Sequence, residues 1–405
     1  MSGAVSAVVP VVDPAAMAKG DPLADSAERA ELRATVRRLV ADVSPPARTH
    51  DLDEAEQFDD ALHAALAEIG ALAIGAPAAS GGVGDVRDQL VVVEELAAGP
   101  TSMAAFLIAQ YAVTGVLGSY GTTEHHREVL DDLLAGRTKL AFSMSEPSGG
   151  TDVARAMRTR AERASDGWRI NGQKMWTSGA TLAQHIVVLA RTTPIERSPV
   201  HGVTMFLVPA DAPGVTIRAM DTFGIHGMST CEIFYDDVLV DEGAVLGEVD
   251  AGMRQVFATI NREGLNAAAA CIGAGRGALD LAVLYARERE VFGKAIGAFQ
   301  TPQHWLVDGA VALESARGLM VRAAEIEVAG GRADALASMA KLVASEGAER
   351  IARKGMQLMG GAGYSREVAM QRYFRDVRLW SFSPLTNEMV RNRIGEQVLG
   401  LPRSY

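Results

Sequence analysis

Four separate segments of the chain hold the residues whose types and spacing could bind a ligand or do chemistry. The first is a polar, glycine-rich loop, the second surrounds a tryptophan, and the third alternates arginine with glutamate. The fourth joins a glycine pair to later Arg-Asp and Thr-Asn-Glu groups. They cover residues 141–152, 172–178, 287–300 and 357–388. Taken singly, each has a structural explanation, since the tryptophan could belong to a core and the Arg/Glu run could be a solvated helix face.

Two other kinds of site receive little support from the spacing. Gly273, Gly275 and Gly277 could suggest a phosphate-binding loop, but no strand precedes them and no GxGxxG pattern is present. Close helix packing is the better interpretation of these glycines. The eight histidines are scattered, and the one adjacent pair, His125-His126, has no HxxxH or CxxC beside it. We therefore expect no metal site.

Composition excludes several classes of protein. The chain has 405 residues, 48% of them hydrophobic, which is enough for a large core and for two or three domains. Its net charge of −11 argues against a nucleic-acid partner. No run of eighteen consecutive apolar residues occurs, so we expect no membrane span. Cys231 and Cys271 are the only cysteines, which excludes a disulfide framework and fits a reducing, cytoplasmic location.

The spacing of apolar residues divides the chain into helical and β-rich parts. Leu32, Val36, Leu39 and Val40 form one helical stripe, and helical periodicity returns from about Gly252 to the end. Between these parts the texture is that of a compact β-domain. We predict a flexible arm over residues 1–23, an N-terminal helical domain over 24–138, a β-domain over 139–248 and a C-terminal helical bundle over 249–405.

Five short segments carry the prediction of a β-domain. Residues 168–176 are interpreted as two strands joined by a tight turn at Asn171-Gly172, because that dipeptide tolerates the positive φ angles of a hairpin. Four further strands are predicted at Ile186–Ala190, Val203–Val208, Val215–Ile217 and Cys231–Tyr235.

Together and in this order, the four polar segments resemble the acyl-CoA dehydrogenase family from about residue 24 to residue 400. The resemblance implies a mainly α fold with a central β-domain: an N-terminal helical domain, a small β-barrel-like domain and a C-terminal four-helix bundle. It implies FAD as the cofactor and α,β-dehydrogenation of an acyl thioester as the reaction. A base would remove a proton from Cα while a hydride leaves Cβ for the flavin.

The resemblance also assigns residues to the flavin. The loop after residue 141 and the segment around the tryptophan correspond to contacts with the flavin ring, while the segments at 287–300 and 357–361 correspond to contacts that a neighbouring subunit makes with the rest of FAD. Arginine suits a diphosphate, and glycine lets the backbone approach a phosphate. The cofactor-binding residues implied in this way are Phe142, Met144, Ser145, Thr151, Trp176, Ser178, Arg289, Phe292, Gln300, Gln357, Gly360, Gly361, Thr386 and Glu388.

Two positions supply the catalytic base in this family. The commoner one follows the Arg-Asp pair and corresponds here to Pro384, which cannot accept a proton. The other, used by isovaleryl-CoA dehydrogenase-type members, lies on the helix that begins the C-terminal domain and corresponds to Glu263. The resemblance therefore implies Glu263 as the base. The alternative is that Glu263 is an ordinary exposed helix residue.

Pro384 has a second consequence, because relatives use the backbone N–H at this position to bind the thioester oxygen and proline has none. Losing such a donor costs about 3 kcal/mol of transition-state stabilisation unless another group, such as the Leu385 N–H, replaces it. His226 stands near a position where many relatives carry arginine. Both departures fit a specialised substrate, such as an acyl or aminoacyl group on a carrier protein.

Three functions remain open from the sequence. The first is an acyl-thioester dehydrogenase that acts on acyl-CoA or on a carrier-bound substrate. It would work as a homodimer or homotetramer and be reoxidised by electron-transferring flavoprotein or oxygen. The second is a flavin-dependent monooxygenase on the same fold, which needs no α-proton base. The third is an inactive interaction protein, against which the intact flavin-contact segments argue.

Overall fold

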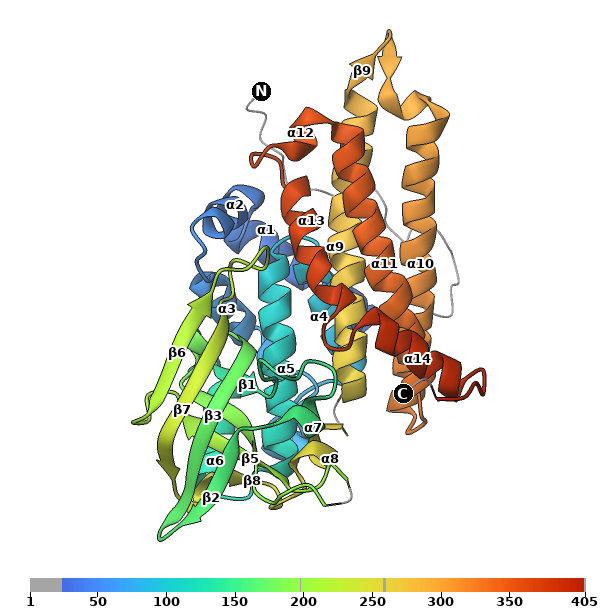
Figure 1. Ribbon diagram of the computed structural model, residues 1–405. Coiled ribbons are helices and arrows are strands. Elements are labelled where there is room, and N and C mark those ends of the chain that lie inside the picture. Colours follow the sequence, from blue (N-terminus) through green and yellow to red (C-terminus); the bar gives the residue numbers. More distant parts are fainter. Residues whose placement is uncertain (1–23, 197, 258–259, 404–405) are drawn as a thin grey trace.

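The computed structural model describes residues 24–196, 198–257 and 260–403, which form helices, then a β-sheet, then helices again (Figure 1). This is the predicted mainly α fold with a central β-domain. The predicted arm, residues 1–23, lies outside the described residues.

The N-terminal helices begin at residues that satisfy their first backbone N–H groups. The Ser26 side chain accepts from the Arg29 N–H, and Asp85 and Asp88 form a reciprocal capping box. Val36 is the fully buried member of the predicted stripe. The helices are α1 (Ala27–Val43), α2 (Pro46–Glu54), α3 (Asp60–Glu68), α4 (Val86–Ala97), α5 (Thr101–Tyr120) and α6 (Glu124–Leu134).

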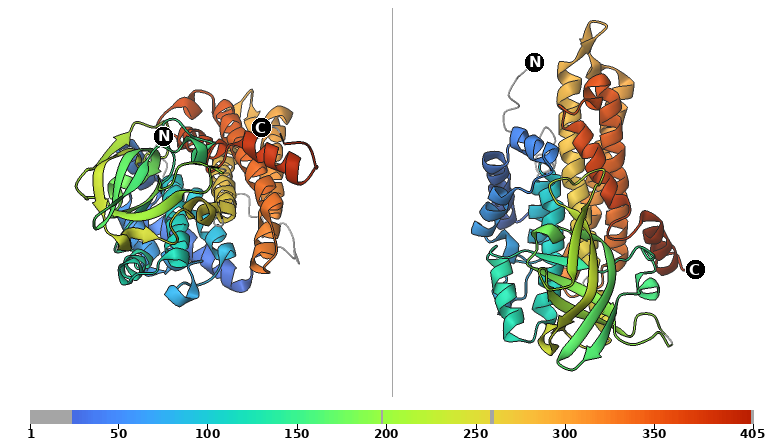
Figure 2. Two further views of the ribbon diagram at one scale, coloured as in Figure 1. Left: turned by 60° about the horizontal axis from the view of Figure 1, so that its bottom comes forward. Right: turned by 60° about the vertical axis from the view of Figure 1, so that its left-hand side comes forward.

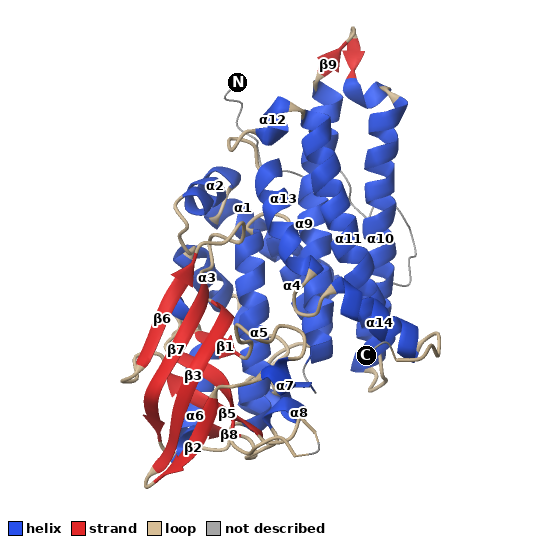
Figure 3. Cartoon of the chain, viewed as in Figure 1, coloured by secondary structure: helices blue, strands red, loops and turns tan. Residues whose placement is uncertain are grey.

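The middle of the chain forms one mixed sheet at one end of the molecule (Figure 3). Its strand order is β6-β7-β3-β2-β4-β5-β8, and β1 pairs in parallel with β4. The four strands predicted after residue 180 are confirmed. The strands are β1 (Leu140–Ser143), β2 (Arg160–Ala164), β3 (Gly167–Ser178), β4 (His185–Arg191), β5 (Val203–Pro209), β6 (Val215–Met220), β7 (Thr230–Val240) and β8 (Val245–Leu246), with the short α7 (Val153–Ala156) between β1 and β2.

Alternate residues of β4 lie in two different cores. Val187 and Leu189 pack with Val113 and Leu117 of α5, whereas Ile186 and Val188 join a separate apolar cluster. This alternation follows from the two-residue period of a strand. The sheet is therefore anchored to α5 on one face, and the same helix lies beside it in Figures 1 and 2.

The tight turn predicted at Asn171-Gly172 is wrong. β3 runs through both residues, and the turn that joins β2 to β3 lies at residues 165–166. The dipeptide instead marks an irregularity, because the pairing of β3 with β7 shifts register between Ile170 and Gly172. Gly172 has φ 152°, and an added Cβ there would be 2.5 Å from the Thr159 Oγ1. The extra residue lies on β7, where three steps from Tyr235 to Val238 match two on β3, and the missing side chain of Gly172 allows the close approach to Thr159.

Three long helices dominate the C-terminal part and lie side by side (Figures 1 and 2). A small hairpin joins the first two at the end farthest from the sheet. The elements are α8 (Gly252–Phe257), α9 (Ile260–Glu288), β9 (Glu290–Val291), β10 (Lys294–Ala295), α10 (Gln300–Val328), α11 (Asp334–Met359), α12 (Gly361–Tyr364), α13 (Met370–Asp376) and α14 (Asn387–Gln397).

The glycines of α9 allow this helix to approach its neighbours closely, as predicted. An added Cβ at Gly273 would be 2.1 Å from the Glu94 carbonyl oxygen of α4, and one at Gly277 would be 2.4 Å from the Ala98 carbonyl oxygen. The N-terminal and C-terminal helices thus meet backbone to backbone, and no room is left there for a phosphate.

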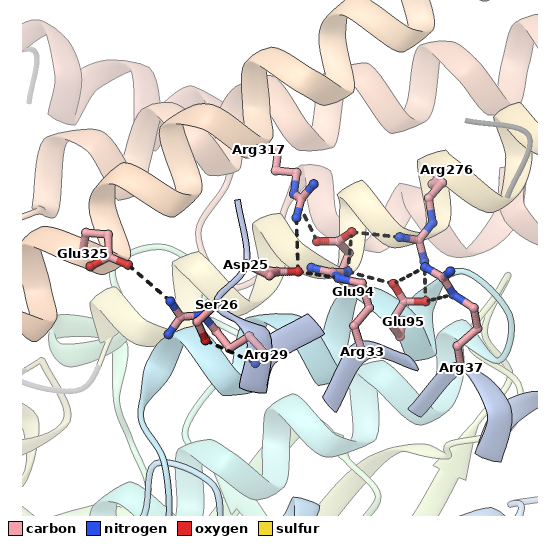
Figure 4. Close-up of polar contacts among 10 residues, drawn as sticks. All are labelled: Asp25, Ser26, Arg29, Arg33, Arg37, Glu94, Glu95, Arg276, Arg317 and Glu325. Carbon is pink, nitrogen blue, oxygen red and sulfur yellow. Dashed lines mark hydrogen bonds and ion pairs between the residues drawn. The ribbon is translucent and has the colours of Figure 1, made fainter. Parts of the chain in front are cut away.

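A buried cluster of charges fastens the same helices together (Figure 4). Glu94 and Glu95 of α4 receive Arg33 from α1 and Arg276 from α9. The Arg276 guanidinium lies 2.9 Å from a carboxylate oxygen of each glutamate, and the Arg33 Nη1 lies 2.7 Å from Glu95 Oε1. Arg317 of α10 also approaches Glu94, at 3.9 Å. Paired charges therefore fix where α9 sits against α4.

Two helices, Thr101–Tyr120 and Arg262–Glu288, are long and apolar enough to cross a membrane by length and composition. Of their most apolar windows, 72% and 78% of the residues are buried inside the fold. Their apolar surface is accounted for by the protein core.

Candidate active site

The loop that follows β1 is held in place by a buried lysine. Lys174 of β3 is fully buried, and its Nζ donates to the Met144 carbonyl oxygen and to Glu146 Oε1, each at 2.9 Å. The Met175 N–H donates to the Ser145 carbonyl oxygen, also at 2.9 Å. Two of the predicted flavin-contact residues, Met144 and Ser145, are thereby fixed against the strand that carries Trp176.

Glu146 completes this buried pair. Its carboxylate also accepts the backbone N–H groups of Arg158 and Thr159, at 2.6 and 2.9 Å. Burial acts to raise the pKa of Glu146, but Lys174 and the two N–H groups outweigh it and hold the pKa below its ordinary value. Burial lowers the pKa of Lys174 to about 8, against the opposing effect of Glu146. The pair stabilises the loop because each buried charge has its partner.

The sequence analysis did not single out Lys174 or Glu146, although they lie within two of the polar segments, residues 172–178 and 141–152. A signal was present in the period of β3, where Trp168 and Ile170 occupy inward positions and Lys174 follows on the same parity. A charged residue at an inward position of a strand requires a buried partner. The sequence did not indicate which of the many acidic residues would be that partner.

Trp176 is placed by a local irregularity of β3. Its backbone adopts φ 64°, and the pairing with β7 shifts register between Lys174 and Thr177. The next residue, Thr177, turns inward and its hydroxyl lies 3.1 Å from that of Ser143. The indole is left 56% exposed. A large apolar ring held outward by unusual backbone geometry is the kind of surface that a planar ligand covers.

Three further residues predicted to contact the flavin, Phe142, Thr151 and Ser178, lie on β1, on β3 or in the loop before α7. Phe142 is a half-buried member of β1, and Ser178 ends β3. Thr151 is exposed in the loop before α7. The structure thus places Phe142, Met144, Ser145, Trp176 and Ser178 on β1, β3 and the loop between them.

Glu263 lies in the first turn of α9 and is half-buried. Burial alone raises the pKa of its carboxyl to about 7. Within the described part of the chain, no cation pairs with it. The next residue, Gly264, lines an open hollow that is also lined by Pro384 and Leu385. One of the two positions compared as sites for a base, Pro384, therefore lines this hollow, and the other, Glu263, precedes a residue that lines it.

The segment after Pro384 is fixed by a second buried lysine. Lys341 of α11 donates from its Nζ to the Leu385 carbonyl oxygen at 2.7 Å and to Asn387 Oδ1 at 2.8 Å. Thr386 caps α14, because its hydroxyl accepts the Met389 N–H at 3.2 Å. Glu388, in the same first turn, is exposed.

Six predicted flavin contacts lie elsewhere in this chain. They occupy the β9–β10 hairpin, the start of α10 and the α11–α12 junction, at the end of the long helices that is farthest from the sheet (Figures 1 and 2). Phe292, at the hairpin, is 96% exposed. One chain by itself does not bring this group to Trp176. The group consists of Arg289, Phe292, Gln300, Gln357, Gly360 and Gly361.

His226 belongs to a polar contact between the sheet region and the helices. The Arg375 Nη1 lies 3.3 Å from His226 Nδ1, and the Arg375 Nη2 donates to Asp53 Oδ2 at 2.5 Å. The neighbouring Asp376 accepts the Ile225 N–H at 2.8 Å. The Arg-Asp pair thus holds the loop around His226 against α13 and α2.

Comparison with known proteins identifies this arrangement. Models of the N-terminal, middle and C-terminal domains of acyl-CoA dehydrogenase match residues 26–137, 141–238 and 250–399. The acyl-CoA dehydrogenase FadE12 of Mycobacterium tuberculosis is 31% identical over 387 residues, which cover 94% of this chain and 98% of the relative. The chain belongs to the acyl-CoA dehydrogenase family. It is accordingly an FAD-dependent oxidoreductase that acts on CH–CH bonds of acyl thioesters.

Solved structures of the acyl-CoA dehydrogenase family agree with the fold. An acyl-CoA dehydrogenase from Geobacillus kaustophilus superposes with a TM-score of 0.88 at 30% identity, covering 93% of this chain and 99% of the other. A glutaryl-CoA dehydrogenase from Mycobacterium smegmatis in complex with FADH2 gives a TM-score of 0.87 at 26% identity, covering 96% and 98%. The fixed Met144–Ser145 loop and the outward indole of Trp176 are features that suit a flavin ring.

Proposed function

We propose that this protein removes hydrogen from the Cα and Cβ atoms of an acyl thioester, with Glu263 as the catalytic base. One observation carries the proposal: a carboxyl with a pKa near 7 begins α9, beside the cavity where proline replaces the alternative base. A base of this pKa is matched to neutral pH, where about half of it is ionised and the ionised form is basic enough to take a proton. This is the base position of isovaleryl-CoA dehydrogenase-type members.

The chemistry divides between the chain and its cofactor. The Glu263 carboxylate takes the proton from Cα, and the C–H electron pair that this releases forms the new Cα–Cβ double bond. FAD, when bound, supplies the oxidising group that accepts the hydride from Cβ. The products are an α,β-unsaturated thioester and reduced FAD, which electron-transferring flavoprotein or oxygen would reoxidise.

We further propose the division of the cofactor site between two subunits. The residues near the sheet, Phe142, Met144, Ser145, Thr151, Trp176 and Ser178, would contact FAD together with Thr386 and Glu388 of the same chain. The exposed group at the other end of the long helices would reach the FAD of a neighbouring chain. The separation of the two groups within one chain supports this division, which requires a homodimer or homotetramer.

The thioester oxygen needs donors other than residue 384. Because proline has no N–H, we propose that the Leu385 N–H serves instead. The Lys341 bond to the Leu385 carbonyl holds this peptide segment in place. A carrier-bound acyl group remains a candidate substrate beside acyl-CoA, since the altered residues at 384 and 226 indicate a specialised pocket.

An anaerobic titration of the purified flavoprotein tests the proposal. Acyl-CoAs and carrier-bound thioesters are added in turn while the visible flavin absorption is followed. Bleaching by one class of thioester establishes dehydrogenation and identifies the carrier. A flavin that stays oxidised with every thioester contradicts the proposal.

Pro384 specifically favours a second candidate, a flavin-dependent monooxygenase, because such an enzyme needs no base at either position. Glu263→Gln separates the two functions. It should nearly abolish dehydrogenation but leave oxygen insertion largely intact. Purification of the protein without any flavin would instead indicate an inactive interaction protein.

A further inference from the structure

The hollow beside Glu263 has an unusual charge. It lies between α9, α11 and α14, and two of its lining side chains are cationic, Lys341 and Arg393. The other lining residues, Gly264, Ala337, Ser338, Pro384, Leu385 and Val390, carry no charge, so among the residues that the structure describes no carboxylate lines the hollow. A cavity with two cations and no anion of its own is suited to an anionic ligand.

Lys341 presents a buried ammonium to this hollow. The residue is only 2% exposed, and two of its three N–H groups donate to Leu385 and Asn387. Burial lowers its pKa to about 8, while Cys271, Glu388 and Glu346 act in the opposite direction. One N–H remains for a group in the cavity, and an anion bound there would offset the cost of burying the charge.

Arg393 is the second cation and differs from its neighbour on α14. Arg391 forms an ion pair with Glu346. Arg393 is half-buried, and no acidic side chain pairs with it in the part of the chain that the structure describes. A guanidinium presents parallel N–H groups that match a carboxylate in a two-pronged contact. A side chain with this capacity, partly withdrawn from water and facing a cavity, is suited to binding an anion.

We propose that this hollow binds a carboxylate carried by the acyl group, so that the substrate is the thioester of a dicarboxylic acid. The inference rests on the proposed function, because Glu263 and the adjoining Gly264 place the reacting carbons next to the hollow. A protonated aminoacyl group would be disfavoured by the two cations.

Binding of inert ligands tests the proposal without requiring turnover. The probes are two thioethers of coenzyme A, S-(3-carboxypropyl)-CoA and S-butyl-CoA, titrated calorimetrically into the FAD-loaded enzyme. The wild-type protein should bind the carboxylated thioether about tenfold more tightly, and Arg393→Met should remove this preference. Arg393→Lys should retain part of it, and Arg391→Met, the matched control on the same helix, should retain all of it.

A second variant covers the case in which Arg393→Met does not fold. Ser338→Asp places a carboxylate in the hollow and should weaken the carboxylated thioether about tenfold, with S-butyl-CoA changed within about threefold. Equal affinities of the wild-type protein for the two thioethers would overturn the proposal. So would an equal loss for both in Arg393→Met, which would assign the arginine to the phosphates of coenzyme A.

The outcome for this pocket can be told apart from the outcome for catalysis. If the carboxylated thioether is preferred but succinyl-CoA and glutaryl-CoA leave the flavin oxidised, binding of a carboxylate in the hollow is supported and the proposed dehydrogenation is contradicted. If neutral acyl-CoAs bleach the flavin and the two thioethers bind equally, dehydrogenation stands and the carboxylate site fails.

Discussion

Two glutamates on adjacent helices, the buried Glu95 and the half-buried Glu263, have carboxyls whose pKa values are shifted in opposite directions. Burial acts to raise the pKa of Glu95 on α4, but Arg276, Arg37 and Arg33 outweigh it and lower the pKa to about 2. Among the described residues, none pairs with Glu263 on α9 in this way, and burial raises its pKa to about 7. The residue type is the same, and the difference lies in the charges around it.

The contrast separates a structural site from a chemical one. Both sites involve α9. This helix carries Arg276, which pairs with Glu95, and it carries Glu263 in its first turn. A buried carboxylate that is paired with a cation stays ionised and stabilises the fold, because removing either charge would leave the other buried without a partner. An unpaired one can exchange a proton near neutral pH, which is the property that a base requires.

Glu95→Gln should lower the free energy of unfolding by about 3 to 5 kcal/mol, because Arg276 and Arg33 would then share the single carboxylate of Glu94 and Arg37 would lose its ion pair. The measurement is chemical denaturation followed by circular dichroism. Glu263→Gln is the matched control and should change the free energy of unfolding by less than about 1 kcal/mol, since no ion pair is broken. Equal losses in the two variants would refute the distinction between them.

His63 on α3 extends the contrast to a buried base. Burial, assisted by Lys139, lowers its pKa to about 4. The folded state therefore resists protonation that the unfolded chain accepts below about pH 6.5. Stability should fall by about 3 kcal/mol as the pH drops from 6.5 to 4, and change no further through this group below that.

His63→Gln should remove this part of the pH dependence. The difference in unfolding free energy between wild type and variant, measured at pH 7 and at pH 4, isolates the histidine from the carboxylates that titrate nearby. A difference that is the same at both pH values would show that His63 is protonated as easily in the folded protein as in water.

The pH dependence of catalysis should report the raised pKa of Glu263. Only the ionised carboxylate can take the α-proton, so kcat/KM should rise about tenfold per pH unit in the acid range and level off above pH 7. The measurement is the rate of thioester oxidation between pH 5 and pH 8.5 with an artificial electron acceptor. If kcat/KM already levelled off near pH 4.5, the pKa of the base would be that of a solvated carboxyl, which would contradict a desolvated Glu263.

The smallest effect is expected for charges that water already screens. Arg137 and Asp132 form an ion pair in which the side chains are 62% and 49% exposed. Asp132→Asn should change the free energy of unfolding by less than about 0.5 kcal/mol. A loss approaching that of Glu95→Gln in the same denaturation experiment would mean that burial does not decide the strength of the ion pairs.

The sequence predicted the fold well, because helices and strands are indicated by patterns among residues that are close together in the chain. Strand periodicity located β4 to β7, and the glycines of α9 indicated close helix contacts. The hairpin at Asn171-Gly172 failed because the dipeptide also suits a bulge, and only the pairing of β3 with β7 distinguishes the two.

The electrostatic sites could be predicted only in part, because their partners lie far apart in the chain. Glu94 and Arg276 are 182 residues apart, and Lys174 meets a glutamate 28 residues earlier. The family resemblance pointed to Glu263, but its loss of solvation depends on packing that no local pattern encodes. Likewise, nothing in the spacing brings Lys341 and Arg393 to the cavity that Pro384 borders.

The central claim is that Glu263 is the base, and the rate of flavin reduction in Glu263→Gln tests it most directly. Wild-type and variant enzymes, each shown by absorbance to carry its full complement of FAD, are mixed anaerobically with the thioester that bleaches the wild-type flavin fastest. The account predicts a rate about 10³-fold lower in the variant, with FAD content and fold unchanged. A variant that reduces its flavin within about tenfold of the wild-type rate would contradict it.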